Sequence, residues 1–268
     1  MGFIDALVPE VRRSIESSAY VEGVPPEAPE SVPSFRRAIQ EDSRRRALVV
    51  EYKRVSPGRA DPVLPARSTE EFVAATSRGP VSAYSCLATV PEFRGSPKDV
   101  AEIARATRSP VLFKEFVVDL RQVEVAARCG ASAVLLIARL PGPGRRAEPL
   151  TSLAEAAHAR GLEVLLEFHE RSELSRQADV AADVYGVNAR NLDTLAIDRP
   201  KAMETLAEAG RLGLRPLLGL SGVESPRDAR AYWDAGADGI LVGSAVARAP
   251  DPAAFLSSLR DISGGEPR

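Results

Sequence analysis

The chain has 268 residues, which suits one α/β barrel domain of about 250 residues with a short extension. Its formal net charge of −2 excludes a general attraction to nucleic acids or acidic membrane surfaces, so local groups must hold any anionic ligand and a small-molecule partner is expected. Only two cysteines, no apolar leader core and no long uninterrupted apolar segment favour a cytoplasmic protein without a disulfide framework or a membrane span.

Residues 1–46 are predicted to form an N-terminal helical extension. Two amphipathic patterns, 3–17 and 33–46, indicate helices, and the segment between them is rich in proline. We interpret the extension as a cap that packs on a single catalytic domain, residues 47–268. The run Arg44-Arg45-Arg46 is interpreted as the cationic last turn of the second helix, where the helix dipole favours it.

From residue 47 onward the chain repeats one unit: a short apolar run, a polar or glycine-containing break and a longer helical pattern. Several helical patterns open with Ser, Asp or Pro, which are typical of helix starts. Eight alternations over roughly 220 residues predict an α/β fold of the TIM (β/α)8 barrel type. A doubly wound open sheet is the alternative, but it favours fewer strands and a GxGxxG motif that this chain lacks. The predicted strands are 47–53, 81–87, 110–116, 132–138, 162–168, 184–188, 215–221 and 239–244.

Reactive side chains and glycines gather at the ends of these runs, where barrel strands present residues to a ligand. Lysine occurs only at 53, 98, 114 and 201, so two of the four lysines close predicted strands. An ammonium can give up a proton whereas a guanidinium cannot, so both lysines are candidates for chemistry. The candidates at the strand ends are Glu51, Lys53, Lys114, Glu167, Asn188, Ser221, Gly222, Gly243 and Ser244.

Lys114 and Glu167 are predicted to face each other across the barrel mouth. An ammonium beside carboxylates can act as a general acid, and a carboxylate against an apolar wall can act as a base with a raised pKa. A structural ion pair at the rim is the alternative. Asn188 would orient a hydroxyl or carbonyl of the substrate, whereas His158 is interpreted as a surface residue and His169 as a loop residue.

The glycines after the seventh and eighth strands predict a phosphate site. Barrel loops at these positions often bind phosphate through backbone N–H groups, and glycine lets the backbone approach a ligand closely. Ordinary turn glycine is the alternative for either pair alone. Lys53, Ser56 and Arg190 are predicted to add supporting contacts, so we expect a phosphorylated ligand.

Apolar residues close to strand ends are candidates for a slot that takes an aromatic group, with core packing as the alternative: Phe93, Phe116, Leu136 and Leu192. No grouping of His, Asp or Glu has metal-ligand spacing, and no pattern requires a cofactor, so neither is expected. The loop 54–68 is long and rich in Pro, Gly and Arg, and it is predicted to close over the substrate.

The motifs at these strand ends resemble those of one enzyme family, indole-3-glycerol phosphate synthase of tryptophan biosynthesis. The most specific are EYKR-SP, within EYKRVSPG (51–58), and GxN-R-L, within GVNARNLDTL (186–195). LFKEF (112–116), LLIA (135–138), LLEF (165–168), LSGV (220–223) and ILVGSAVAR (240–248) extend the resemblance over roughly residues 33–258. It implies a carboxy-lyase that closes 1-(2-carboxyphenylamino)-1-deoxyribulose 5-phosphate to an indole with loss of carbon dioxide and water.

The resemblance also implies roles for the candidate residues. Lys114 would be the general acid at the ribulose carbonyl, and Glu167 a base in the later dehydration. Lys53 would hold the anthranilate carboxylate or act as a second acid, with Glu51 fixing it or relaying protons to it. The remaining groups would hold the rest of the substrate, the sugar chain on Asn188 and Ser221 and the phosphate on Gly222, Gly243 and Ser244. An association with other enzymes of tryptophan biosynthesis is left open.

One position departs from the family pattern. The family usually has an acidic residue immediately before the serine of the seventh strand, and this chain has Leu220. The loss of a carboxylate near two lysines should change their proton affinity, which implies lower activity or a somewhat different substrate. Two alternatives therefore stay open: a diverged paralogue that binds a phosphorylated metabolite, and an aldolase that uses Lys114 as a Schiff-base nucleophile. Phosphoribosylanthranilate isomerase resembles the chain less. That enzyme has a cysteine at the end of its first strand and an aspartate at the end of its sixth, and this chain has Glu51 and Asn188 at those positions.

Overall fold

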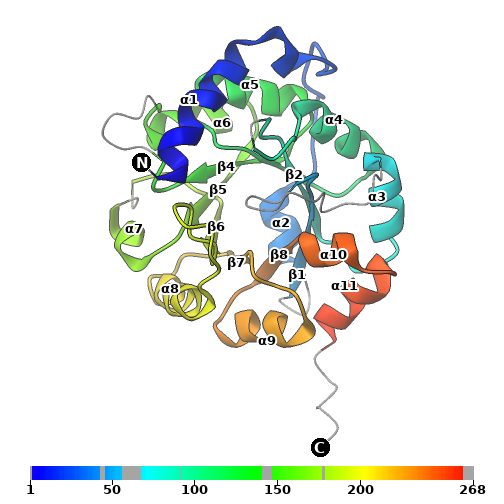
Figure 1. Ribbon diagram of the computed structural model, residues 1–268, viewed down its shortest axis with the longest axis vertical. Coiled ribbons are helices and arrows are strands. Elements are labelled where there is room, and N and C mark those ends of the chain that lie inside the picture. Colours follow the sequence, from blue (N-terminus) through cyan, green and yellow to red (C-terminus); the bar gives the residue numbers. More distant parts are fainter. Residues whose placement is uncertain are drawn as a thin grey trace, which may run out of the picture.

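The computed structural model describes residues 2–42, 46–55, 68–90, 92–140, 147–176 and 179–261. Its strands form a closed parallel barrel in which each strand pairs with the next one in sequence, and the last pairs with the first. Helices surround this barrel (Figure 1). The predicted TIM (β/α)8 barrel is therefore confirmed. The strands are β1 (Ala47–Tyr52), β2 (Ala83–Leu87), β3 (Val111–Lys114), β4 (Ala133–Ile137), β5 (Glu163–Phe168), β6 (Val184–Asn188), β7 (Leu217–Leu220) and β8 (Gly239–Val242).

All eight predicted strands are present, and their ends differ from the predicted ones by two residues at most. Helices cover the outer face of the sheet and side chains fill its interior, so nearly every strand residue is buried. Burial on both faces explains why the strands appear in the sequence as continuous apolar runs rather than as alternating patterns. None of the helices within the described ranges is long and apolar enough to cross a membrane.

The helices of the outer ring start where the sequence signals predict. The side chains of Ser68, Ser96, Asp119, Ser225 and Asp251 each accept a hydrogen bond from a backbone N–H in the first turn of a helix. The ring consists of α3 (Thr69–Thr76), α4 (Pro97–Ala106), α5 (Leu120–Arg128), α6 (Leu150–His158), α7 (Arg171–Arg176), α8 (Arg199–Arg211), α9 (Pro226–Asp234), α10 (Ser244–Arg248) and α11 (Pro252–Arg260). Proline occupies the first turn of four helices of the ring, α4, α8, α9 and α11, where its missing N–H costs nothing.

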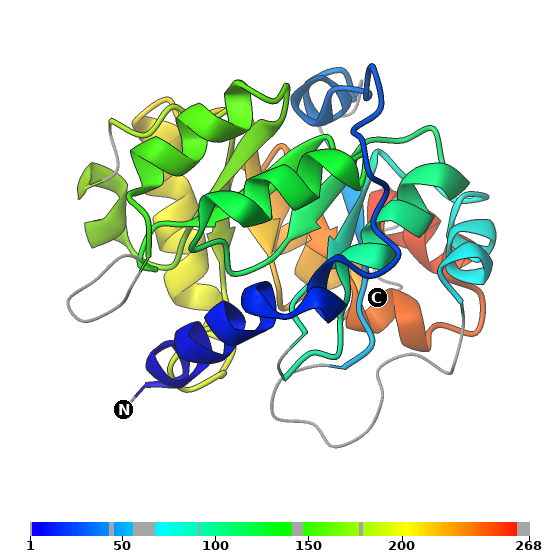
Figure 2. The same ribbon diagram turned by 90° about the horizontal axis from the view of Figure 1, so that it is seen from above.

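The two α-helices of the N-terminal segment, α1 (Phe3–Glu16) and α2 (Phe35–Gln40), lie at opposite ends of the barrel (Figure 2). Ser34 Oγ and the backbone N–H of Arg36 donate hydrogen bonds of 2.5 and 2.6 Å to the carboxylate of Glu163, at the start of β5. These contacts fix α2 at the amino ends of the strands. At the other end, the ring of Phe3 packs edge-on against Phe93, with 6.4 Å between ring centroids. The start of α1 therefore reaches the carboxyl ends of the strands.

The second predicted helix, 33–46, is too long, because α2 ends at Gln40. The residues that follow are polar and offer no apolar side chain to bury. Asp42 instead accepts a hydrogen bond of 3.2 Å from the backbone N–H of Arg46 and pairs with Arg260 at the end of α11. Arg46 Nη1 donates to the backbone carbonyl of Arg260 at 3.1 Å, so this arginine lies outside the helix whose last turn it was predicted to form.

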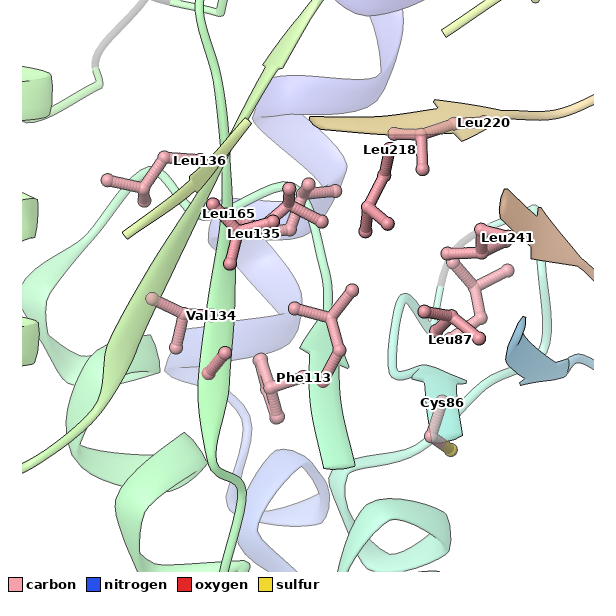
Figure 3. Packing of buried hydrophobic residues seen from close by; sticks show 14 of the residues in the cluster. Cys86, Leu87, Phe113, Val134, Leu135, Leu136, Leu165, Leu218, Leu220 and Leu241 are labelled. Carbon is pink, nitrogen blue, oxygen red and sulfur yellow. The ribbon is translucent and has the colours of Figure 1, made fainter. Parts of the chain in front are cut away.

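Leucine side chains from β4, β5, β7 and β8 fill the barrel interior (Figure 3). The pairing of β4 with β5 shows which residues of β4 point into the barrel. Leu135 pairs with Leu165 and Ile137 with Glu167, so these positions share the inner face. Leu136 belongs to the opposite face, toward the helices.

Leu220 also points inward, because it pairs in register with Asn188. It is 1% exposed, and its Cδ1 atom would lie only 2.8 Å from a Cβ atom added to Gly186. The leucine that departs from the family pattern is therefore a packed interior residue.

Candidate active site

A cavity of about 590 Å³, counting its open mouth, lies at the carboxyl ends of the strands. Strands β1, β3, β5 and β6, the loops that follow them and the turn after β7 supply its polar groups. The cavity brings together ten of the residues predicted from the sequence: Glu51, Lys53, Phe93, Lys114, Phe116, Glu167, Asn188, Arg190, Leu192 and Ser221.

The other predicted residues are not part of the described lining. Leu136 does not line the cavity; its neighbours Leu135 and Ile137 do, because side chains alternate between the two faces of β4. Gly222, Gly243 and Ser244 follow β7 and β8 outside the lining. Ser56 and most of the predicted lid, 54–68, fall outside the described residues.

Glu51 is the centre of a buried charge cluster at the end of β1. Its Oε1 atom lies 2.9 Å from Lys53 Nζ, and its Oε2 atom lies 3.1 Å from Lys114 Nζ. Burial raises the pKa of Glu51, but the positive charges of the two lysines outweigh it and lower the pKa to about 2. Burial lowers the pKa of Lys114, but Glu51 and Glu167 outweigh it and raise that pKa. At neutral pH Lys114 is therefore an ammonium group that can donate a proton.

Gly243 makes room for this cluster. A Cβ atom at this position would lie 2.8 Å from Glu51 Oε1 and 3.1 Å from Glu51 Cβ. The backbone after β8 therefore approaches the carboxylate more closely than any side chain would allow.

We expect Gly243→Ala to displace Glu51 and lower kcat/KM by about 10²-fold, because a shift of roughly 1 Å at a reacting site has that effect. Overpacking should also lower the free energy of unfolding by about 1–3 kcal/mol. Gly210→Ala, in the last turn of α8, is the control, since only Arg215 Nη2 lies near the added carbon, at 3.3 Å. Steady-state kinetics and urea unfolding of both variants test this expectation; unchanged kinetics in Gly243→Ala would contradict it.

Glu167 presents a buried carboxylate to the same cavity from β5. Its Oε1 atom lies 3.2 Å from Nε2 of His169, while its Oε2 atom accepts no hydrogen bond from any residue that the structure describes. Burial raises the pKa of Glu167, but His169 and, more weakly, Lys114 and Asn188 outweigh it and lower the pKa below its usual value. The predicted raised pKa of Glu167 is therefore wrong, because the neighbouring side chain is a cation rather than an apolar wall.

Asn188 and Arg190 are organised by the loop after β6. The backbone N–H of Arg190 donates to Asn188 Oδ1 at 2.9 Å, and Arg190 Nη1 donates to the carbonyl of Leu195 at 2.8 Å. Leu195 also lines the cavity and has a φ of 59°, a left-handed conformation that is uncommon for leucine. The loop thus holds an amide and a guanidinium at fixed places on the cavity rim.

The turn after β7 carries Ser221 in an unusual backbone conformation. Ser221 has a φ of 64° and Gly222 a φ of 74°, so two successive residues are left-handed. The hydroxyl of Tyr232 donates to the Ser221 carbonyl at 2.7 Å, and Arg199 Nε donates to the Gly222 carbonyl at 2.7 Å. Helices α8 and α9 thereby fix a strained turn at the mouth, as is common at ligand sites.

Aromatic rings form one wall of the cavity. Phe93 lies 6.4 Å from Phe3 and 6.0 Å from Phe116, measured between ring centroids. Phe3 comes from α1, so the N-terminal extension contributes to the site. The lining residues that sequence reasoning missed are Phe3, Leu87, Glu115, Leu135, Ile137 and Leu195.

Glu115, next to Lys114, is a second buried carboxyl group at this wall. Burial raises its pKa to about 7, against opposing hydrogen bonds from Thr89 and Gln122. Within the described ranges, no group of three or more His, Cys, Asp or Glu side chains is arranged to hold a metal ion.

Comparisons of the sequence with known proteins identify its family. The sequence model of the indole-3-glycerol phosphate synthase family matches residues 7–259. Indole-3-glycerol phosphate synthase 2 of Streptomyces coelicolor is 34% identical over 265 residues, 96% of this chain and 98% of that protein. Indole-3-glycerol phosphate synthase of Methanopyrus kandleri is 38% identical over 215 residues, 80% of this chain and 82% of that protein. Thiamine phosphate pyrophosphorylase from Pyrococcus furiosus superimposes with a TM-score of 0.59 over 85% of this chain and 96% of that chain, but at 19% identity it supports the fold alone.

Proposed function

Because the chain belongs to the indole-3-glycerol phosphate synthase family, we propose that it closes 1-(2-carboxyphenylamino)-1-deoxyribulose 5-phosphate to an indole, with loss of carbon dioxide and water. It is an enzyme of the carboxy-lyase class. The observation that carries the detailed proposal is the cluster of Lys53, Glu51 and Lys114 in a cavity that also presents the Glu167 carboxylate.

The chemical groups of the site match the parts of this substrate. The aromatic wall of Phe3, Phe93 and Phe116 suits the anthranilate ring. Lys53 can hold the anthranilate carboxylate, because its ammonium lies in the cavity beside Glu51. The phosphate is proposed to bind the backbone after β7 and β8, at Gly222, Gly243 and Ser244, as in many barrels.

The first step joins the ring carbon that bears the carboxylate to the carbonyl carbon of the ribulose chain. Negative charge develops on the carbonyl oxygen, and Lys114 donates its proton there, so that a hydroxyl group forms. Loss of carbon dioxide then returns an electron pair to the ring and restores its aromaticity. The raised pKa of Lys114 keeps the group protonated before the reaction, which a general acid requires.

The second step removes the new hydroxyl as water. A proton must leave the atom next to the carbon that loses the hydroxyl, and Glu167 is proposed to accept it, while Lys53 is proposed to donate a proton to the departing hydroxyl oxygen. The lowered pKa keeps this carboxylate ionised at neutral pH, and its Oε2 atom has no hydrogen-bond donor among the described residues. Asn188 and Ser221, which also line the cavity, are proposed to orient the sugar hydroxyls.

Leu220 favours a second candidate function, binding of a phosphorylated metabolite without turnover. The residue is buried against Gly186 beneath the cavity, where the family usually has a carboxylate. The structure nevertheless keeps two carboxylates, Glu51 and Glu167, close enough to raise the pKa of Lys114. The lysine therefore retains its proton without an acidic group at position 220, which supports the synthase proposal.

The test is indole fluorescence of the purified protein supplied with 1-(2-carboxyphenylamino)-1-deoxyribulose 5-phosphate, together with Leu220→Glu. We expect turnover in the parent protein. A parent that binds the substrate in calorimetry but forms no indole, while Leu220→Glu does form it, would establish the diverged binding function. A covalent adduct trapped by borohydride at Lys114 would instead establish Schiff-base chemistry.

A further inference from the structure

His169 is a buried histidine that does not line the cavity. It follows β5 directly, and its side chain is 4% exposed. Its Nε2 atom lies 3.2 Å from Glu167 Oε1, and its Nδ1 atom lies 3.8 Å from Glu173 Oε2. Carboxylates from β5 and α7 thus flank the ring. The backbone N–H of His169 also donates to Glu173 Oε2 at 2.6 Å, which fixes the position of that carboxylate. His169 does lie in the loop after β5, as interpreted from the sequence, but that interpretation missed its burial and its contact with Glu167.

The two carboxylates decide the charge of the ring. Burial lowers the pKa of His169, but the contacts with Glu167 and Glu173 outweigh it and raise the pKa to about 9. The imidazole is therefore a cation at neutral pH. A cation in this position favours the ionised form of Glu167, whose burial alone would favour the neutral acid.

Further charges around the pair come from three neighbouring elements. Arg139, after β4, lies 4.0 Å from Glu173 Oε1 and 2.7 Å from Asp193 in the loop after β6. Lys114 of β3 acts on Glu167 from across the cavity. On the outer rim, Glu170 pairs with Lys201 of α8 at 2.9 Å. These cations lie nearer to the carboxylates than to the imidazole, and the two groups that raise the pKa of His169 are Glu167 and Glu173.

We infer that His169 is a positioning residue for Glu167: held as an imidazolium between Glu167 and Glu173, it keeps the Glu167 carboxylate ionised and directed into the cavity without touching the substrate. The inference rests on the proposed function, in which Glu167 is the base. Since Nε2 of His169 contacts Oε1, the Oε2 atom stays free to accept a proton. Glu173 has the supporting task of keeping the ring charged.

The chain suits a direct test, because His158 and His169 are its only histidines. His158 pairs with Asp183 at 2.8 Å, is 37% exposed and lies outside the cavity lining, so His158→Gln is the matched control and also assigns the NMR signals. In the parent protein we expect the His169 ring signal to titrate near pH 9. In Glu173→Gln, which can still accept the backbone hydrogen bond, that titration should move to lower pH.

Kinetics separate positioning from a merely structural role. In His169→Gln the pKa on the acidic side of the kcat/KM profile should rise by about 1–3 units, because Glu167 loses a cation within 4 Å. Activity should therefore fall at least tenfold at low pH and recover as pH rises, with KM unchanged, whereas His158→Gln should match the parent protein. An equal loss at every pH, with an unshifted profile, would overturn the inference.

The NMR titration does not depend on turnover. If the parent protein formed no indole, the proposed function would fail while a His169 pKa near 9 would still establish the ion pair. A His169 signal that titrates near its ordinary pKa of 6.5, in a protein that does turn over the substrate, would overturn the inference and leave the function standing.

Discussion

Lys114→Ala is expected to lower kcat/KM by about 10²–10⁴-fold, the usual effect of removing a general acid. The fold should persist, because Glu51 keeps the ion pair with Lys53 at 2.9 Å and no buried charge is left without a partner. Lys114→Arg sharpens the test: a guanidinium can still pair with Glu51, but it cannot give up a proton. We therefore expect Lys114→Arg to keep the melting temperature of the parent protein and to lose most of its activity.

Lys98→Ala is the matched control for this substitution. Lys98 lies on α4, pairs with Glu102 at 3.7 Å and has a side chain that is 56% exposed, so its removal should change neither kinetics nor stability. Indole formation measures activity, and thermal unfolding measures stability. A Lys114→Ala protein that melts far below the parent but retains its rate per folded molecule would show that the lysine is only a structural ion pair at the rim.

The sequence predicts the fold of this chain well because every strand is an apolar run bounded by polar or glycine-containing breaks. It also predicts the polar half of the site, since the strand ends of a barrel meet at one edge, and the charged residues of β1, β3 and β5 and Asn188 of β6 lie there. The continuous apolar runs that reveal the strands also explain why Leu136 was wrongly predicted to line the cavity. A strand buried on both faces shows no alternation, so the sequence does not reveal whether Leu135 or Leu136 points inward.

Other parts of the site depend on contacts between distant segments. Phe3 reaches the cavity only because α1 packs at the carboxyl ends of the strands, ninety residues away from its partner Phe93. His169 is buried because Glu173 lies one helical turn further on, in α7, and accepts the hydrogen bond from its backbone. The E-x-H-x-x-x-E spacing of Glu167, His169 and Glu173 was visible in the sequence, and it becomes informative once the turn between β5 and α7 is known.

The charges that remain in the cavity show how the site can do without a carboxylate at position 220. A leucine in the barrel interior removes a carboxylate from the family pattern, yet the cluster around Glu51 contains two lysines and a carboxylate in direct contact. The nearest cation to Glu167 is instead His169, and Lys114 acts on it more weakly. The two carboxylates thus have separate cationic partners, which divides the cavity into an acid side at β1 and β3 and a base side at β5.

Glu167→Gln tests the base side and is expected to lower kcat by about 10²–10⁴-fold, because an amide of the same shape cannot accept the proton lost in the dehydration. The melting temperature should change little, since His169 keeps Glu173 as a carboxylate partner. Glu170→Gln is the control: Glu170 lies three residues further on, pairs with Lys201 and is 45% exposed. A kcat equal to that of the parent protein would exclude Glu167 as the base.

The pH dependence of kcat/KM is a second test of Glu167 as the base. The pKa of Glu167 lies below its usual value and that of Lys114 above its own, so both groups carry the charge they need throughout the neutral range. The kcat/KM profile should therefore be flat around pH 7, fall on the acid side as Glu167 is protonated and fall on the alkaline side as Lys114 loses its proton. Glu167→Gln should remove the acid limb and leave the alkaline limb, because only the base has been replaced. If both limbs survived in Glu167→Gln, another group would set the acid limb, and the assignment of the base to β5 would be wrong.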